Sequence, residues 1–217
     1  MLLHDTIQIT EPLRGKTLMI ALNTRVVQHD LLIKILPISA DLFVFVYPFY
    51  LVALYLRGIK KQQKYFQYAS FAIAFSAGVA TLINQIIQYF GDKSRPETAI
   101  LLKQNLILDH LPTDPFPSDH AAVSFAIAMS TLLWGLKYKD KHFVKMSVFF
   151  WIACGVMSFS RVAVAIHRPT DILVWRVIGL CSALLLSSDR VWVWMVRIII
   201  LPLIAFQERI TTRFKRS

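Results

Sequence analysis

The sequence predicts an all-α membrane protein, a polytopic helix bundle with five or six spans, on three observations. Of its 217 residues, 56% are hydrophobic, and the mean hydropathy is +0.53, both above what soluble domains show. Apolar runs long enough to cross a bilayer recur along the chain. Lysine and arginine gather in short clusters beside these runs, as they do in the loops of membrane proteins.

The net charge of +11 would suggest a nucleic-acid partner for a soluble protein. Here the cations flank apolar runs, so we interpret them as topology signals. We therefore expect membrane lipids, and not nucleic acid, as partners. The chain contains no internal repeat and no low-complexity tract, so residues 1–217 are predicted to form a single domain of about half a dozen helices.

The first part of the chain combines a surface helix with two spans. Residues 1–37 mix apolar and polar positions at a spacing typical of an amphipathic helix that lies along the membrane surface. The first span is expected at residues 38–56, with Asp41 near one end. The second covers residues 66–90, a run of 25 positions without a charged residue, which is enough to cross about 30 Å of hydrocarbon.

Three further apolar runs follow a long polar loop. They predict a third span at residues 120–136, a fourth at 146–166 and a fifth at 172–188. Residues 191–206 form either a sixth span or a helix that lies in the interface together with the basic C-terminal tail, residues 209–216. The cationic tail is best accommodated on the cytoplasmic side, which slightly favours the interfacial helix.

The basic loops predict which side of the membrane each loop faces. Loops 57–64 and 137–145 carry most of the lysines between spans, so we place them in the cytoplasm. Loops 91–119 and 162–171 then share the extracytoplasmic side. Two polar loops that are far apart in sequence are thereby brought to the same face, where their charged groups can meet.

The second of these loops contains a candidate phosphate site. Arg161 ends an apolar run, His167 follows six residues later and Asp171 lies four beyond it. Arginine inside a membrane usually lines a polar cavity, and its forked donors match phosphate oxygens. A histidine can act as nucleophile or base when a carboxylate holds its far ring nitrogen. Because Pro169 interrupts the apolar pattern, we expect His167 on a turn and Asp171 in the first turn of the next helix.

The first of these loops offers a second candidate phosphate site. Ser118 is a good N-cap residue, and a helix is predicted directly after it. The free N–H groups and the dipole of a helix N-terminus attract anions, and His120 in the first turn could give a proton to a departing phosphate oxygen. Taken alone, this pattern also fits an ordinary helix cap, and Lys93 and Arg95 fit simple contacts to lipid headgroups.

Together, these segments resemble the phosphatidic-acid-phosphatase/haloperoxidase superfamily. The three signatures of that superfamily are Lys-x6-Arg-Pro, Pro-Ser-Gly-His and Ser-Arg-x5-His-x3-Asp. This chain has three corresponding segments in the same order: Arg95-Pro96, Pro117-Ser118-Asp119-His120 and Ser160-Arg161-x5-His167-x3-Asp171. Two positions depart from the pattern, since Gln88 replaces the first-signature lysine and Asp119 replaces glycine. In both departures, this chain resembles the bacterial undecaprenyl-diphosphate phosphatases of the bacitracin-resistance type.

The resemblance implies a role for each signature residue. His167 would attack the terminal phosphorus and form a phosphohistidine, with Asp171 orienting its imidazole. His120 would protonate the leaving oxygen and then activate water, while Arg95, Arg161 and Ser118 would bind the phosphoryl oxygens.

The two departures also imply hypotheses. Gln88 carries no charge, so Lys93 could replace the missing cation. Asp119 could pair with Lys93 or Arg168, or tune His120, and so select diphosphates. No cluster with metal-ligand spacing is present in the sequence, so we expect neither a metal nor another cofactor.

The resemblance also implies a function and a location. The chain would remove the terminal phosphate of undecaprenyl diphosphate, at the extracytoplasmic face of a bacterial cell membrane, and so recycle the lipid carrier for peptidoglycan synthesis. Related enzymes that act on phosphatidylglycerophosphate, phosphatidic acid or lipid A would share the same motifs. The alternative from another functional class is a protein without enzymatic activity, either a lipid transporter or a scaffold.

One charge in the fifth span matches no signature. Arg176 lies five residues after Asp171 in an otherwise apolar run, and its exposure to hydrocarbon would be costly. It could extend to the outer interface, or it could pair with Asp41 and brace the first span against the fifth.

Overall fold

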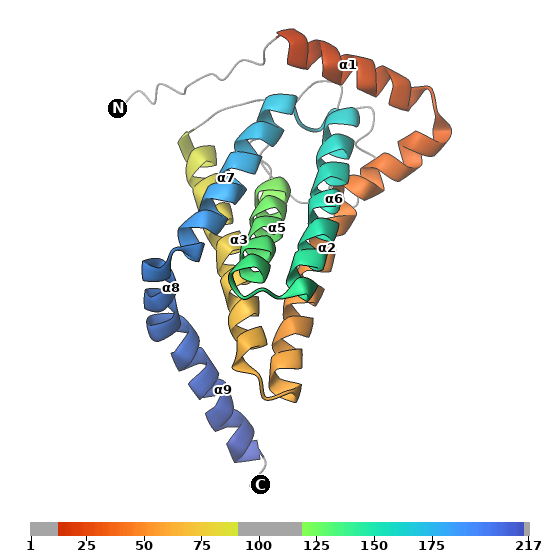
Figure 1. Ribbon diagram of the computed structural model, residues 1–217. Coiled ribbons are helices and arrows are strands. Elements are labelled where there is room, and N and C mark those ends of the chain that lie inside the picture. Colours follow the sequence, from red (N-terminus) through yellow and green to blue (C-terminus); the bar gives the residue numbers. More distant parts are fainter. Residues whose placement is uncertain (1–12, 91–118, 215–217) are drawn as a thin grey trace.

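The computed structural model describes residues 13–90 and 119–214, and every regular element in these ranges is a helix (Figure 1). The helices are α1 (Leu13–Val27), α2 (Asp30–Lys60), α3 (Lys64–Phe90), α5 (Asp119–Lys137), α6 (Lys141–Ala163), α7 (Pro169–Ser187), α8 (Asp189–Met195), a π-helical turn η2 (Val196–Ile200) and α9 (Leu201–Phe214). In the described part, five helical segments are long and apolar enough to cross a membrane: α2, α3, α6, α7 and Asp189–Arg209. The predicted all-α membrane bundle is confirmed.

The outer surface of the bundle is apolar, as a bilayer requires. Large apolar side chains such as Phe49, Ile152 and Leu173 are 76%, 62% and 61% exposed. In water, a continuous apolar surface of this kind would favour aggregation. In a membrane, the same side chains face lipid.

Helix α5 occupies the centre of the bundle. It packs against α3, α6 and α7, and these helices surround it in Figure 1. It is not among the five segments that qualify as spans by length and composition, although its residues were predicted as the third span. Its alanines explain how it fits, because Ala121, Ala122, Ala126 and Ala128 are fully buried and small residues let helix backbones approach closely.

Helix α7 packs closely against α5 at Gly179, and we expect Gly179→Ala to destabilise the bundle. A Cβ atom there would lie 2.6 Å from the carbonyl oxygen of Ala122 and 2.7 Å from Cβ of Phe125. Overpacking of this kind costs about 1–3 kcal/mol, so the thermal unfolding midpoint in detergent should fall. Gly155→Ala on α6 is the matched control, since no atom lies within 4 Å of a Cβ there. Equal midpoints for the two variants would show that α7 adjusts without cost.

The N-terminal surface helix ends earlier than expected, and residues 1–12 of the predicted range lie outside the described residues. Helix α1 lies across one end of the bundle (Figure 1), where Met19 packs against Val162 and Ala165 and Asn23 Nδ2 donates to the carbonyl of Ala163 at 3.3 Å. The expectation that residues 1–37 form this helix was wrong for residues 30–37, which are the first turns of α2. The reason is that the chain turns at residues 28–29, after which one helix continues through Pro37 and Pro48.

The C-terminal segment from α8 to α9 continues away from α7. Figure 1 shows it extending beyond the end of α7, in the same general direction, and not returning through the bundle. It packs on the α2–α3 hairpin, where Tyr55 Oη donates to Gln207 Oε1 at 2.5 Å and Lys64 Nζ lies 3.2 Å from Glu208 Oε1. A chain that has crossed with α7 cannot cross again in the same direction, so this arrangement favours the interfacial helix over a sixth span.

Candidate active site

The turn between α6 and α7 brings three of the predicted site residues together. Arg161 lies in the last turn of α6, the chain turns over residues 164–168, and α7 begins at Pro169 with Asp171 in its first turn. The predicted positions of His167 on a turn and Asp171 at a helix start are confirmed. Ala165 within the turn has a left-handed backbone, with φ of 58°, a conformation that costs energy in a residue with a Cβ.

The guanidinium of Arg161 is the centre of this cluster and is 5% exposed. Its Nε donates to the carbonyl oxygen of Ala40 at 3.1 Å. Its Nη2 donates to Asp41 Oδ1 at 2.6 Å. Its Nη1 lies 2.8 Å from Nε2 of His167. One arginine therefore connects the first spanning helix to the candidate nucleophile.

This contact indicates which tautomer of the neutral His167 ring fits the site. A guanidinium is always protonated and can only donate, so Nε2 of His167 accepts the hydrogen bond from Arg161. The neutral imidazole then carries its proton on Nδ1, the nitrogen that faces Asp171. The nucleophilic lone pair is on Nε2, the nitrogen nearest to the candidate phosphate-binding arginine.

Asp171 lies beside His167 and also caps α7. Its Oδ2 is 3.9 Å from His167 Nδ1, which is within ion-pair range but too long for a hydrogen bond. The same oxygen accepts a hydrogen bond from the Arg168 N–H at 2.8 Å. The carboxylate therefore has two tasks, since it caps the helix and places negative charge next to the proton-bearing nitrogen of the ring.

Trp175 is a site neighbour that the sequence reading missed. Its ring meets the His167 ring edge-on, with 4.4 Å between centroids and an interplanar angle of 86°, and it is fully buried. It lies one helical turn after Asp171, on the same face of α7. The four-residue spacing from Asp171 could have predicted this position. A tryptophan in an apolar run, however, is usually interpreted as an ordinary core residue.

His120 reaches the same cluster from α5. It is half-buried, it lies within electrostatic range of the Arg161 guanidinium, and its carbonyl accepts from Ser124 Oγ at 2.6 Å. Gln88 is half-buried near the C-terminal end of α3. Lys93, Arg95 and Ser118 lie outside the described residues, and of Asp119 only the backbone, at the start of α5, is described.

The predicted pair between Arg176 and Asp41 was wrong. Asp41 is buried and forms its ion pair with Arg161, at 2.6 Å, whereas Arg176 is exposed on α7. Burial explains why Asp41 pairs with Arg161 and not with Arg176. The Asp41 carboxylate is 3% exposed and needs a buried cation, and Arg161 is the buried cation that lies beside it. The alternative, in which Arg176 extends to the membrane interface, stays a prediction.

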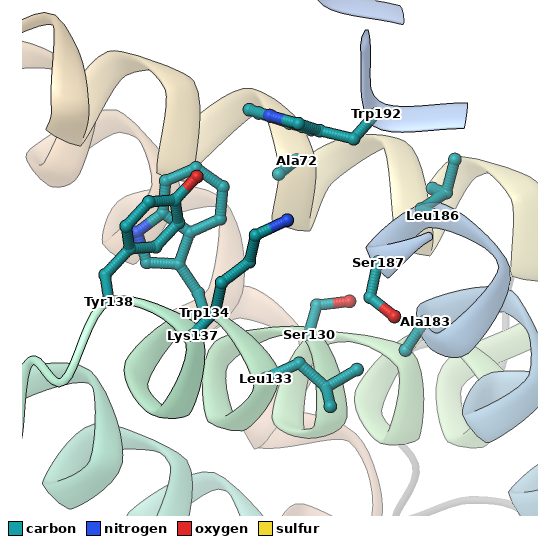
Figure 2. A pocket seen from close by; sticks show the side chains of 10 residues that line it. All are labelled: Ala72, Ser130, Leu133, Trp134, Lys137, Tyr138, Ala183, Leu186, Ser187 and Trp192. Atoms are coloured by element: carbon teal, nitrogen blue, oxygen red, sulfur yellow. The ribbon is translucent and has the colours of Figure 1, made fainter. Parts of the chain in front are cut away.

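A small cavity lies at the other end of α5. It has a volume of about 40 Å³ and is seen from close by in Figure 2. Ser130 and Lys137 point into it, and Lys137 Nζ also pairs with Asp189 Oδ1 at 2.6 Å. The full lining is Ala72, Ser130, Leu133, Trp134, Lys137, Tyr138, Ala183, Leu186, Ser187 and Trp192. Lys137 and His120 are 17 positions apart on one helix, about 25 Å at 1.5 Å per residue, so this cavity is separate from the His167 cluster.

The described part of the candidate site shows no grouping typical of a metal centre. Among residues 13–90 and 119–214, no three His, Cys, Asp or Glu side chains gather closely enough to hold a metal ion. Among the described residues of this cluster, the guanidinium of Arg161 could neutralise a phosphate. The expectation of a reaction without metal stays a prediction.

Comparison with known proteins identifies a family that this chain matches. The family model described as "PAP2 superfamily" matches residues 68–195, a range that includes His120, Arg161, His167 and Asp171. The chain is also similar to an Escherichia coli (strain K12) protein whose name is "Putative undecaprenyl-diphosphatase YbjG", with 27% identity over 158 residues, which cover 71% of this chain and 70% of that protein. No solved structure matches the chain.

Proposed function

The chain belongs to the PAP2 superfamily, and from this premise we propose that it removes the terminal phosphate of undecaprenyl diphosphate in a bacterial cell membrane. The coarser statement, that it is a phosphatase of the membrane and acts on lipids, agrees with the family and with the apolar spanning helices. The name of the Escherichia coli relative supports the undecaprenyl substrate. The product, undecaprenyl phosphate, would return to peptidoglycan synthesis as a lipid carrier.

The observation that carries the proposal is the contact between Arg161 Nη1 and Nε2 of His167, at 2.8 Å. A phosphoryl group that enters here would bind its oxygens to the guanidinium and meet the lone pair of Nε2. Phosphoryl transfer depends mainly on such positioning and on charge neutralisation. The contact therefore joins a phosphate-binding group to a nucleophile in one place.

The proposed reaction has two steps. In the first, the Nε2 lone pair forms a bond to the terminal phosphorus, the bond from that phosphorus to the bridging oxygen breaks, and His120 gives a proton to the departing oxygen of undecaprenyl phosphate. In the second, His120 takes a proton from water, the water oxygen attacks the phosphohistidine, and the P–N bond breaks. Inorganic phosphate leaves, and Nε2 regains its lone pair.

Asp171 would favour both steps through its charge. While the phosphohistidine exists, the imidazole ring carries positive charge, and the carboxylate 3.9 Å from Nδ1 stabilises it. Arg95, Ser118 and Lys93 are proposed to bind further phosphoryl oxygens, with Gln88 and Asp119 contributing to the choice of a diphosphate. The roles of Arg95 and Ser118 rest on the resemblance of the motifs, whereas those of Lys93, Gln88 and Asp119 are hypotheses that start from the two departures from it.

The test is phosphate release by the purified protein in detergent with a chelator present. We expect faster release from undecaprenyl diphosphate than from phosphatidic acid, phosphatidylglycerophosphate or lipid A. Preference for one of the latter would keep the enzyme class and change the substrate. No release from any of them would favour the non-enzymatic transporter or scaffold.

The site is proposed to open to the extracytoplasmic face, and cysteine labelling in intact cells tests this. The lysine-rich turns after α2 and α5 predict the cytoplasmic end. A cysteine at Asn105 should react with an impermeant thiol reagent, and a cysteine at the exposed position Gln63 should react only after the cells are opened. Labelling of Gln63→Cys in intact cells, with protection of Asn105→Cys, would reverse the topology.

A further inference from the structure

Asp41 forms a buried contact with the candidate site from a helix outside the family match. It lies on α2, whereas the match begins at residue 68. Its side chain is 4% exposed, that of Arg161 is 6% exposed, and Oδ1 and Nη2 are 2.6 Å apart. Burying two charges costs free energy unless the pair is close and its remaining polar atoms are hydrogen-bonded. A pair that is buried beside the candidate nucleophile therefore suggests a role in the site.

The contacts of Arg161 divide its guanidinium into two edges. Nε and Nη2 lie on one edge of the planar group, and α2 binds both, through the carbonyl of Ala40 and the carboxylate of Asp41. Nη1 lies on another edge and contacts Nε2 of His167. Two adjacent residues of α2 therefore fix the plane of the guanidinium and direct its remaining edge to the nucleophile.

This division argues against the idea that Asp41 merely takes the place of a substrate phosphate. A phosphoryl group that enters between Nη1 and Nε2 can bind without displacing Asp41, because the carboxylate occupies the opposite edge. The pair with Asp41 can therefore persist throughout the reaction.

Resting on the proposed function, we propose that Asp41 is a positioning residue: it holds the Arg161 guanidinium in the orientation that directs Nη1 to Nε2 of His167, where the entering phosphoryl group would bind. The anchored arginine selects the imidazole tautomer with the proton on Nδ1, and so keeps the reactive lone pair on Nε2. Asp41 itself touches no reacting atom. Its effect reaches the phosphorus through Arg161 and His167.

The first test is the kinetics of Asp41→Asn and Asp41→Glu. Asn keeps the size of the side chain and removes the charge, whereas Glu keeps the charge and shifts the carboxylate by one methylene. For both, kcat should fall by about 10- to 100-fold, the scale of a catalytic group misplaced by about 1 Å. KM should change by less than about threefold, since the loss is in positioning for the transition state. Ser39→Ala is the matched control, because Ser39 is half-buried on the same helix and its hydroxyl donates to the carbonyl of Ile35, one turn earlier. The kinetics of this variant should equal those of the wild type.

The second test does not depend on turnover. In protein with ¹⁵N-labelled imidazoles, with the His167 signal assigned by its loss in His167→Gln, the wild type should show a protonated Nδ1 and an unprotonated Nε2. In Asp41→Asn, the two tautomers should mix. If the wild type releases no phosphate but shows this change, the proposed function fails while the link from Asp41 to His167 stands.

Three results would overturn the inference. The first is an unchanged kcat and an unchanged tautomer in Asp41→Asn. The second is tighter inhibition by inorganic phosphate in that variant with kcat intact, which would make Asp41 a competitor of the substrate. The third is failure of both variants to fold, judged by thermal unfolding in detergent against Ser39→Ala, which would make the ion pair a structural element only.

Discussion

His167→Ala is expected to abolish phosphate release while the purified protein remains folded in detergent. The variant removes Nε2, the atom that is proposed to bond to phosphorus. Removal of a covalent nucleophile leaves at most the catalysis that binding and electrostatics supply. Phosphate release from a lipid diphosphate measures the loss, and thermal unfolding measures the fold.

The cluster around His167 calls for a matched control. His142 is a histidine at the start of α6, at the opposite end of the bundle, and its backbone N–H, not its ring, is bound by Asp140. His142→Ala should keep wild-type turnover. More than a trace of activity in His167→Ala would mean that another group is the nucleophile and that the mechanism above is wrong.

Asp171→Asn is expected to cause a large but incomplete loss of turnover. The amide oxygen of Asn can still accept from the Arg168 N–H, so the start of α7 should keep its cap. The charge 3.9 Å from His167 Nδ1 is lost, however, and with it the stabilisation of a positively charged ring. Replacement of the carboxylate in an analogous triad lowers kcat by about 10⁴-fold, and we expect a fall on the order of 10²–10⁴-fold here.

Asp171→Ala separates the two tasks of this carboxylate. It removes the charge and also the cap, so it should show the same loss of kcat and, in addition, a fall in stability of about 1 kcal/mol. Thermal unfolding of the two variants side by side measures the difference. If Asp171→Asn were as active as the wild type, the carboxylate would serve only as a helix cap.

The motif spacings predicted the local part of the site. Arg161, His167 and Asp171 lie within eleven positions of one another, so one helix end, one turn and one helix start were enough to bring them together. The turn at residues 164–168 and the helix that begins at Pro169 followed from the proline and the end of the apolar run. What depends on a few neighbouring residues was readable from the sequence.

The long-range part of the site was not readable in this way. Asp41 and Arg161 are 120 positions apart, and Arg176 was an equally charged candidate for the same carboxylate. Which arginine reaches Asp41 depends on the rotation of α6 and α7 about their axes, and this rotation is set by packing around α5. Likewise, the role of Trp175 depends on where the His167 ring lies and not on any feature of its own apolar run.

The central position of α5 determines where the tail of a lipid substrate can lie. Buried alanines fill the middle of the described bundle, so we expect the long prenyl chain of the proposed substrate to lie in the surrounding bilayer, along the outer faces of the helices. The bilayer would then be the solvent for most of the substrate, and the protein would bind mainly the headgroup. Recognition would depend on how many phosphates the headgroup carries, and lipids with tails of different length but the same diphosphate would compete as near equals.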